Sequence, residues 1–308
     1  MNRFIRLRLL AMLLCLPFLL IFISGCGSSS QKKDEPPVYS PLQVLVPEAT
    51  GKETIGSSPM ILDVSNISQG YFIAQSDSSD LTCSLQIISP SGVLYSYFIA
   101  PGESATVTFT EGSGDYTITG YQQVQGDQYA ALYSETVTVQ LENDFLPFLY
   151  PNQYVNFTPD SKASQLALSL IDEDTVDVDA LQQIYDYVVS NLTYDYEKAD
   201  TVTTGYLPDV DEALKTGTGI CFDYAALTTA MLRSCDIPCK LQIGYAGDIK
   251  HAWIDVYIRS KGWVNQAVSF KGDTWTLMDP TFDSNSDDKE AIQDYIGDES
   301  NYTVQFTR

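Results

Sequence analysis

Residues 219–227 read Gly-Ile-Cys-Phe-Asp-Tyr-Ala-Ala-Leu, and they decide how the second half of the chain is interpreted. The glycines at 217 and 219 predict a turn, and the apolar pattern that follows predicts a helix from Cys221 to Ser234. Cys221 would then be the first residue of a helix, where unpaired backbone N–H groups and the helix dipole stabilise an anion. This position favours a thiolate nucleophile. The alternative is an inert cysteine in an apolar helix.

The chain contains one histidine, His251, in the segment Lys-His-Ala-Trp-Ile-Asp. Thiol catalysis needs a base that takes and returns a proton, and an acceptor that orients that base. If a general-base imidazole is present, it is therefore His251. Asp279, placed after the strand-like run 275–278, is a candidate acceptor. A turn-capping aspartate before Pro280 is the alternative interpretation.

The elements around these residues predict an α+β domain over residues 150–308. Asp179 is expected to cap a helix that runs to about Leu192, and a shorter helix is expected near Asp209. Strand-like runs follow at residues 241–243, 252–258, 263–268 and 275–278. Helices followed by strands are typical of the α+β class.

Residues 41–145 predict an N-terminal antiparallel β-sandwich of the Ig-like kind. Short β-type runs alternate apolar and polar residues and are separated by turn residues. The runs are residues 42–46, 83–88, 93–99, 105–109, 115–121 and 135–141. We expect this part to be a spacer or a binding module.

Several motifs together resemble the transglutaminase-like superfamily of papain-like cysteine enzymes. They are residues 219–227, Met231-Leu232-Arg233, Gly244-Tyr245, His251-Ala252-Trp253 and Met278-Asp279-Pro280-Thr281. The resemblance implies a papain-like fold with Cys221 as nucleophile, His251 as general base and acid, and Asp279 as the residue that orients the imidazole. It also implies an oxyanion donor upstream of the cysteine. Tyr194 is the preferred candidate ahead of Tyr196, with packing at a helix end as the alternative.

The activity that this resemblance implies is thiol attack on an amide or peptide carbonyl, giving a thioester. Hydrolysis of the thioester is favoured over transfer to an amine, because no lysine-binding signal is present and water is the default acceptor. The alternatives are a protein cross-linking transglutaminase and a non-catalytic surface binding module that keeps the fold. No cofactor and no metal are expected. The expected substrate is a protein or peptide, with a cell-wall peptide as one candidate.

Residues 1–25 have the features of a signal peptide, with three arginines before an apolar run that ends at small residues. Cys26 directly after Ile23-Ser24-Gly25 resembles the lipobox of bacterial lipoproteins, which implies lipidation at Cys26. A secreted soluble protein or an uncleaved anchor is the alternative. Residues 26–40 then form a flexible tether, and the protein is expected on the extracellular face of the bacterial cell membrane, held there by the lipid anchor alone.

The net charge argues against two classes of binding partner, and the cysteine positions bear on disulfide formation. The net charge of −23 argues against nucleic acid and against docking on anionic lipid head groups, because both need clustered lysine and arginine. Cys15 lies in the leader and Cys26 would be lipidated, which leaves Cys83, Cys221, Cys235 and Cys239. The closely spaced pair Cys235 and Cys239 predicts either a small disulfide or two buried free thiols.

Overall fold

The computed structural model describes residues 35–172, 174–265, 268–271, 274–277 and 302–308. The predictions for the signal peptide 1–25, for Cys26, for residues 26–34 of the tether and for Asp279 lie outside these residues. The described residues belong to one compact unit.

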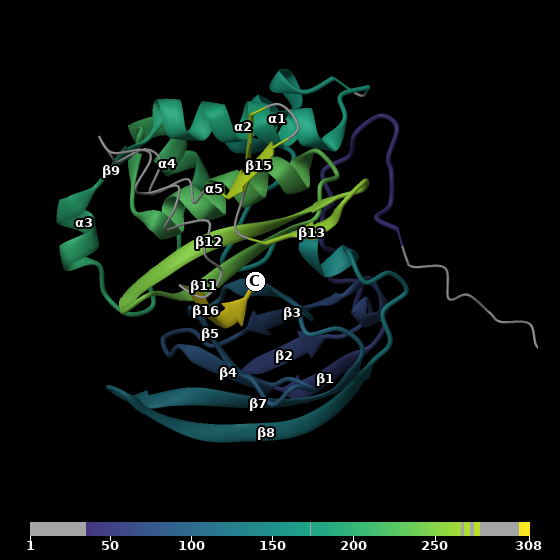
Figure 1. Ribbon diagram of the computed structural model, residues 1–308. Helices are drawn as coiled ribbons and strands as arrows, with labels where there is room; N and C mark the ends of the chain where they lie inside the picture. Colours follow the sequence, from purple (N-terminus) through teal and green to yellow (C-terminus); the bar gives the residue numbers. More distant parts are fainter. Residues whose placement is uncertain (1–34, 173, 266–267, 272–273, 278–301) are drawn as a thin grey trace, which may run out of the picture. The chain divides into compact units, whose positions relative to one another are not determined.

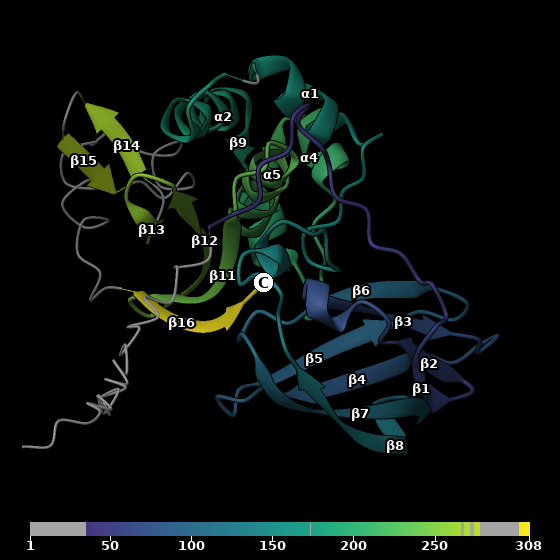
Figure 2. The same ribbon diagram turned by 90° about the vertical axis from the view of Figure 1, so that its right-hand side faces the viewer.

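Eight strands in the N-terminal half form two antiparallel four-stranded sheets that share one hydrophobic core (Figures 1 and 2). The alternation of buried and outward residues explains the packing, since Tyr116 and Ile118 are buried while Thr117 between them is not. This confirms the predicted sandwich. In sheet order the strands are β1 (Thr54–Ser57), β2 (Met60–Asp63), β3 (Tyr71–Ser76) and β6 (Ser104–Thr108), then β5 (Leu94–Ile99), β4 (Cys83–Ile88), β7 (Gly114–Gln125) and β8 (Gln128–Val139).

Among its described residues, the second half combines five helices with a four-stranded antiparallel sheet, which confirms the α+β class. Figure 1 shows α1, α2, α4 and α5 gathered on one side of this sheet. The helices are α1 (Lys162–Leu170), α2 (Asp177–Asn191), α3 (Tyr196–Thr201), α4 (Val210–Thr216) and α5 (Cys221–Ser234). The sheet has the order β13 (Gly262–Val264), β12 (Ile249–Ile258), β11 (Cys239–Ala246) and β16 (Tyr302–Thr307).

Two smaller ladders and two short 3-10 helices complete the described elements. The strands β9 (Thr193–Tyr194) and β10 (Thr218–Gly219) pair in parallel, and β14 (Val268–Lys271) and β15 (Thr274–Leu277) pair antiparallel. The 3-10 helices are η1 (Ile67–Gln69) and η2 (Leu146–Phe148). The ladder of β9 and β10 matters most for function, because it lies directly before α5.

Helix α5 is the central element of this half. Every residue from Asp223 to Ser234 is buried, and the helix packs against α1, α2 and α4 as well as against β11 and β12. A helix that is buried on all sides is held by its neighbours rather than by one amphipathic face. Its first residue is consequently fixed with respect to the sheet.

Two arginines join the sandwich to the α+β half. Arg233, near the end of α5, is fully buried and donates hydrogen bonds to the carbonyls of Tyr150, Cys239 and Arg308. The Arg308 guanidinium lies over the rings of Tyr95, Tyr97 and Tyr154 and donates to the Tyr97 hydroxyl. The Arg233 hydrogen bonds satisfy buried carbonyls from separate parts of the chain.

Two local predictions were wrong. Residues 42–46 form no strand of the sandwich, because Leu42 and Val44 pack into the core around α5 instead. Asp179 does not cap α2, which begins one half-turn earlier at Asp177 with Val176 at the N-cap position. Asp177 and Asp179 both lie in the first turn, where their charges favour the positive end of the helix dipole.

Candidate active site

Cys221 is the first residue of α5, as the turn before it predicted. Gly217 ends α4 in the left-handed conformation with φ 65°, and Ile220 is the extended N-cap residue of α5. The N–H groups of Asp223 and Tyr224 both bond to the Ile220 carbonyl. The N–H groups of Cys221 and the next residue therefore have no acceptor within the helix, and the half-buried thiol lies beside them.

Asp223 holds this turn in shape. Its side chain is 1% exposed, and its Oδ2 accepts a hydrogen bond of 2.8 Å from the Ile220 N–H and one of 2.7 Å from Lys198 Nζ. Its Oδ1 accepts a bond from the Tyr206 hydroxyl. A side chain at Gly219 would lie 2.6 Å from Asp223 Cβ, so the close approach of Asp223 requires glycine there.

The backbone of Tyr194 lies next to the turn that precedes Cys221. In the parallel ladder Tyr194 is opposite Gly219, and the N–H of Asp195 donates to the Gly219 carbonyl at 2.9 Å. The Tyr194 ring packs edge-on against Tyr196 with 4.9 Å between ring centroids. The structure thus brings Tyr194 close to Cys221 in the fold, while its role as oxyanion donor stays a prediction.

His251 is the third residue of β12, opposite Gly244 of β11, and is 6% exposed. Its ring stacks on Trp253 with 6.2 Å between centroids and lies 6.4 Å from the Tyr302 ring. Ala252 belongs to the same core as α5, so strand alternation turns His251 and Trp253 to the other face of β12. Helix α5 and strand β12 pack together, but this alternation does not direct the His251 ring toward α5, so the pairing of His251 with Cys221 stays a prediction.

Gly244 allows these aromatic residues to approach. A side chain at this position would lie 1.9 Å from the Thr303 carbonyl oxygen and 3.1 Å from the Trp253 ring. Tyr302 in turn lies 5.0 Å from Trp253, measured between ring centroids. Sequence reasoning missed Tyr302, because its strand β16 is far along the chain from β11 and no local pattern signals their pairing.

The comparisons with known proteins identify one domain of the chain. Residues 164–280 match the family model described as the transglutaminase-like superfamily, a range that includes Cys221, His251 and Asp279. The chain contains a transglutaminase-like domain. No curated protein matches the chain.

Solved structures with similarity to the chain share little sequence with it. A candidate cysteine protease from Cytophaga hutchinsonii is 18% identical, with 83% of this chain and 84% of that chain covered and a TM-score of 0.38. The periplasmic domain of TgpA from Pseudomonas aeruginosa is 14% identical, with 71% and 93% covered and a TM-score of 0.32. Red sea bream transglutaminase is 15% identical, with 68% and 48% covered and a TM-score of 0.25. The assignment of the transglutaminase-like domain therefore rests on the family match.

Cys221 differs from the other three described cysteines in its exposure. Cys83, Cys235 and Cys239 are buried, and all four thiols are free. Burial raises the pKa of Cys235 and of Cys239 to about 12, which keeps both thiols protonated at neutral pH. Cys235 and Cys239 are therefore two buried free thiols and not a disulfide. Cys221 is thus the accessible thiol of the described part of the transglutaminase-like domain.

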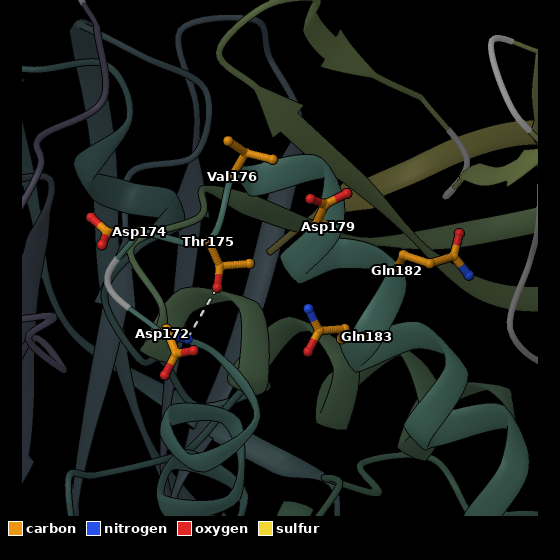
Figure 3. Close-up of a pocket in the computed structure, with 7 residues that line it drawn as sticks. All are labelled: Asp172, Asp174, Thr175, Val176, Asp179, Gln182 and Gln183. Atoms are coloured by element: carbon orange, nitrogen blue, oxygen red, sulfur yellow. Dashed lines mark hydrogen bonds between the residues drawn. The ribbon is translucent and has the colours of Figure 1, made fainter.

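A hollow of the described surface lies elsewhere, at the start of α2 (Figure 3). It encloses about 470 Å³ and contains no thiol or imidazole among its lining residues. These are Asp172, Asp174, Thr175, Val176, Asp179, Gln182 and Gln183. The Thr175 hydroxyl accepts the Asp172 N–H at 3.1 Å, which organises the loop before α2. The hollow is therefore not part of the candidate thiol site.

The described residues contain no group of three or more His, Cys, Asp or Glu side chains arranged to hold a metal ion. No helix among them has the length and apolar character needed to cross a bilayer.

Proposed function

We propose that the transglutaminase-like domain is a cysteine enzyme that attacks amide or peptide carbonyls through Cys221. His251 takes the thiol proton, and the sulfur forms a C–S bond to the carbonyl carbon. The C–N bond then breaks, His251 returns the proton to the leaving amine, and a thioester remains. Asp279 orients the imidazole. The observation that carries the proposal is that Cys221 begins α5 as the accessible thiol, beside helix N–H groups without helical acceptors.

The same turn supplies candidate donors for the oxyanion of the tetrahedral intermediate. The N–H of Cys221 is one, and the Tyr194 hydroxyl is the side-chain candidate. The support for Tyr194 is the ladder that pairs it with Gly219. Tyr194→Phe keeps the ring and removes the hydroxyl, so a fall in kcat with little change in KM is the expected result.

Hydrolysis of the thioester is the proposed outcome, with protein cross-linking as the second candidate. Water is the default acceptor for a protein on the cell surface. Amine transfer needs a passage that excludes water and holds a second substrate. The aromatic wall of Trp253 and Tyr302 beside His251 is the observation that favours this second candidate.

The assay that separates these outcomes uses a glutamine-containing protein and a labelled primary amine. Release of ammonia or cleaved peptide without label supports the hydrolase, and label incorporation identifies a cross-linking enzyme. Cys221→Ala and His251→Ala should each lower either activity at least ~1000-fold. Cys235→Ala is the matched control, because it removes a buried thiol from the other end of α5 and should retain activity. Full activity in Cys221→Ala would exclude Cys221 as the nucleophile, and no activity in any assay would favour the binding-module alternative.

We further propose that the enzyme is a lipoprotein on the extracellular face of a bacterial membrane, acting on protein or peptide substrates such as a cell-wall peptide. The support is the arginine-led apolar leader and the position of Cys26 after Gly25. Membrane fractionation tests the anchor: Cys26→Ala should release the protein or block its processing. Normal cleavage with unchanged membrane retention would contradict it.

A further inference from the structure

A partly buried ion pair lies beside the proposed nucleophile. Lys198 of α3 places its Nζ 2.7 Å from Asp223 Oδ2 and 2.7 Å from the Tyr206 hydroxyl. The same nitrogen lies 4.6 Å from the centroid of the Tyr206 ring. Because Asp223 is the third residue of α5, this pair lies two positions along the helix from Cys221.

The charges of this pair act on the thiol in opposite directions. A carboxylate near a thiolate disfavours it, and an ammonium group favours it. Asp223 is 1% exposed, so solvent screens its charge poorly, and Lys198 is the partner that compensates it. Partial burial lowers the pKa of Lys198, but its bonds to Asp223 and Tyr206 outweigh burial and raise that pKa above its ordinary value. Lys198 is consequently charged at neutral pH.

Tyr206 completes the cluster as a neutral donor. Burial and the hydrogen bond to Asp223 raise the pKa of Tyr206 to about 12. Its hydroxyl therefore keeps its proton for Asp223 while its oxygen accepts from Lys198. The ring packs edge-on against Phe222, the residue directly after Cys221.

We propose that Lys198 is a positioning residue for the Cys221 thiolate: it neutralises Asp223 and ties α3 to the turn at the start of α5. The proposal deepens the proposed function, because it assumes that Cys221 is the nucleophile. Asp223 orders the turn through the Ile220 N–H, and Lys198 removes the electrostatic penalty of that carboxylate. Lys198 acts through Asp223 and is not itself a catalytic residue.

Other ionisable groups border this end of α5, and Lys198→Met and Asp223→Asn leave them unchanged. Tyr194 and Asp195 come from the β9 segment, where the Asp195 carboxylate accepts the Lys198 backbone N–H as the N-cap of α3. The exposed pair Glu212 and Lys215 comes from α4. His251 comes from β12. Comparisons at a single pH keep the contribution of these groups constant.

The test is the rate at which iodoacetamide alkylates Cys221 in the full chain at pH 7, followed by peptide-resolved mass spectrometry. Lys198→Met should slow alkylation roughly three- to tenfold, because it removes a cation and leaves Asp223 uncompensated. Asp223→Asn should accelerate it, because the cation remains and the anion is gone. Lys198→Arg should restore the wild-type rate to within about twofold.

The controls separate charge from folding. Lys215→Met breaks the exposed ion pair with Glu212 and should leave the rate unchanged. The double variant Lys198→Met/Asp223→Asn is neutral and should fall between the two single variants. If Lys198→Met and Asp223→Asn changed the alkylation rate in the same direction, the proposal would be overturned. Disruption of the turn before Cys221 would affect the rate in both variants alike. An unchanged rate in Lys198→Met would overturn it as well.

Alkylation requires no turnover, so this result is independent of the proposed activity. If Cys221→Ala kept full activity, the proposed function would fail while the alkylation result still stood. If Cys221→Ala were inactive and Lys198→Met alkylated normally, the function would stand and the role of Lys198 would fall. If the proposed function and the role of Lys198 both hold, kcat/KM of Lys198→Met should decrease by about the same factor as its alkylation rate.

Discussion

Asp236 follows α5 in an unusual state for a carboxyl group. It is 4% exposed, and its backbone adopts the left-handed conformation with φ 58°. One oxygen accepts the Tyr39 N–H at 3.2 Å, and Oδ1 has no hydrogen-bond partner among the described residues. Burial raises the pKa of Asp236 from 3.8 to about 7, although the Tyr39 bond and Arg259 act in the opposite direction.

This predicts that stability decreases as pH rises from about 4 to about 7. Over that range the unfolded chain loses the Asp236 proton while the folded protein retains it, so folding binds a proton. Above about pH 7 both states are ionised and this contribution is constant. Asp236→Asn removes the charge and suits φ 58°, so it should stabilise the protein at pH 8 by on the order of 2 kcal/mol, and by less at pH 5. Urea unfolding at the two pH values is the measurement, and an equal effect at both would exclude the charge as the cause.

At the residue scale the sequence predicted the place of Cys221 but not its surroundings. The glycine turn and the apolar run are local signals, and they located the first residue of α5 correctly. Lys198 and Tyr206 come from segments with no such signal, and only the folded chain brings them to Asp223. Asp279 lies outside the described residues, so the complete triad stays a prediction.

At the scale of the element, Gly244 controls how β16 joins the sheet. A methyl group there would lie 1.9 Å from the Thr303 carbonyl oxygen, a backbone atom that cannot rotate away. Gly244→Ala should therefore displace β16 and lower the free energy of unfolding by roughly 2–4 kcal/mol. Gly102→Ala is the control, since its side chain would enter open space and only the strain of φ 74°, about 1 kcal/mol, applies. Equal losses in urea unfolding would show that β16 adapts.

Elements with local patterns were predictable, and those that depend on distant partners were not. Helix α5 and strands β4, β5 and β12 carry their apolar periodicity in their own sequence. Residues 42–46 carry a strand-like pattern too, yet Val44 fills a gap in the core around α5. A short apolar run shows that a residue will be buried, but it does not show in which core.

At the scale of the whole molecule, Arg308 links the two halves. Its guanidinium lies 4.0 Å from the Tyr154 ring centroid and 2.8 Å from the Tyr97 hydroxyl. Arg308→Ala should lower the unfolding temperature and separate one calorimetric transition into two, because it removes a buried cation from aromatic rings on the sandwich side. Arg308→Lys keeps the charge without the planar fork and should give an intermediate result. A single transition in Arg308→Ala at the wild-type temperature would contradict this link.

Strand β16 also bears on how the protein is made. A ribosome delivers β11 well before residues 302–307, so the newly made sheet has one edge of unpaired N–H and C=O groups until β16 arrives. Such an edge is a template for pairing with other chains. The aromatic wall beside His251 is completed at the same moment, because Tyr302 opens that strand. A nascent or prematurely terminated chain without these residues would expose that edge and would lack the Tyr302 side of the aromatic wall beside His251.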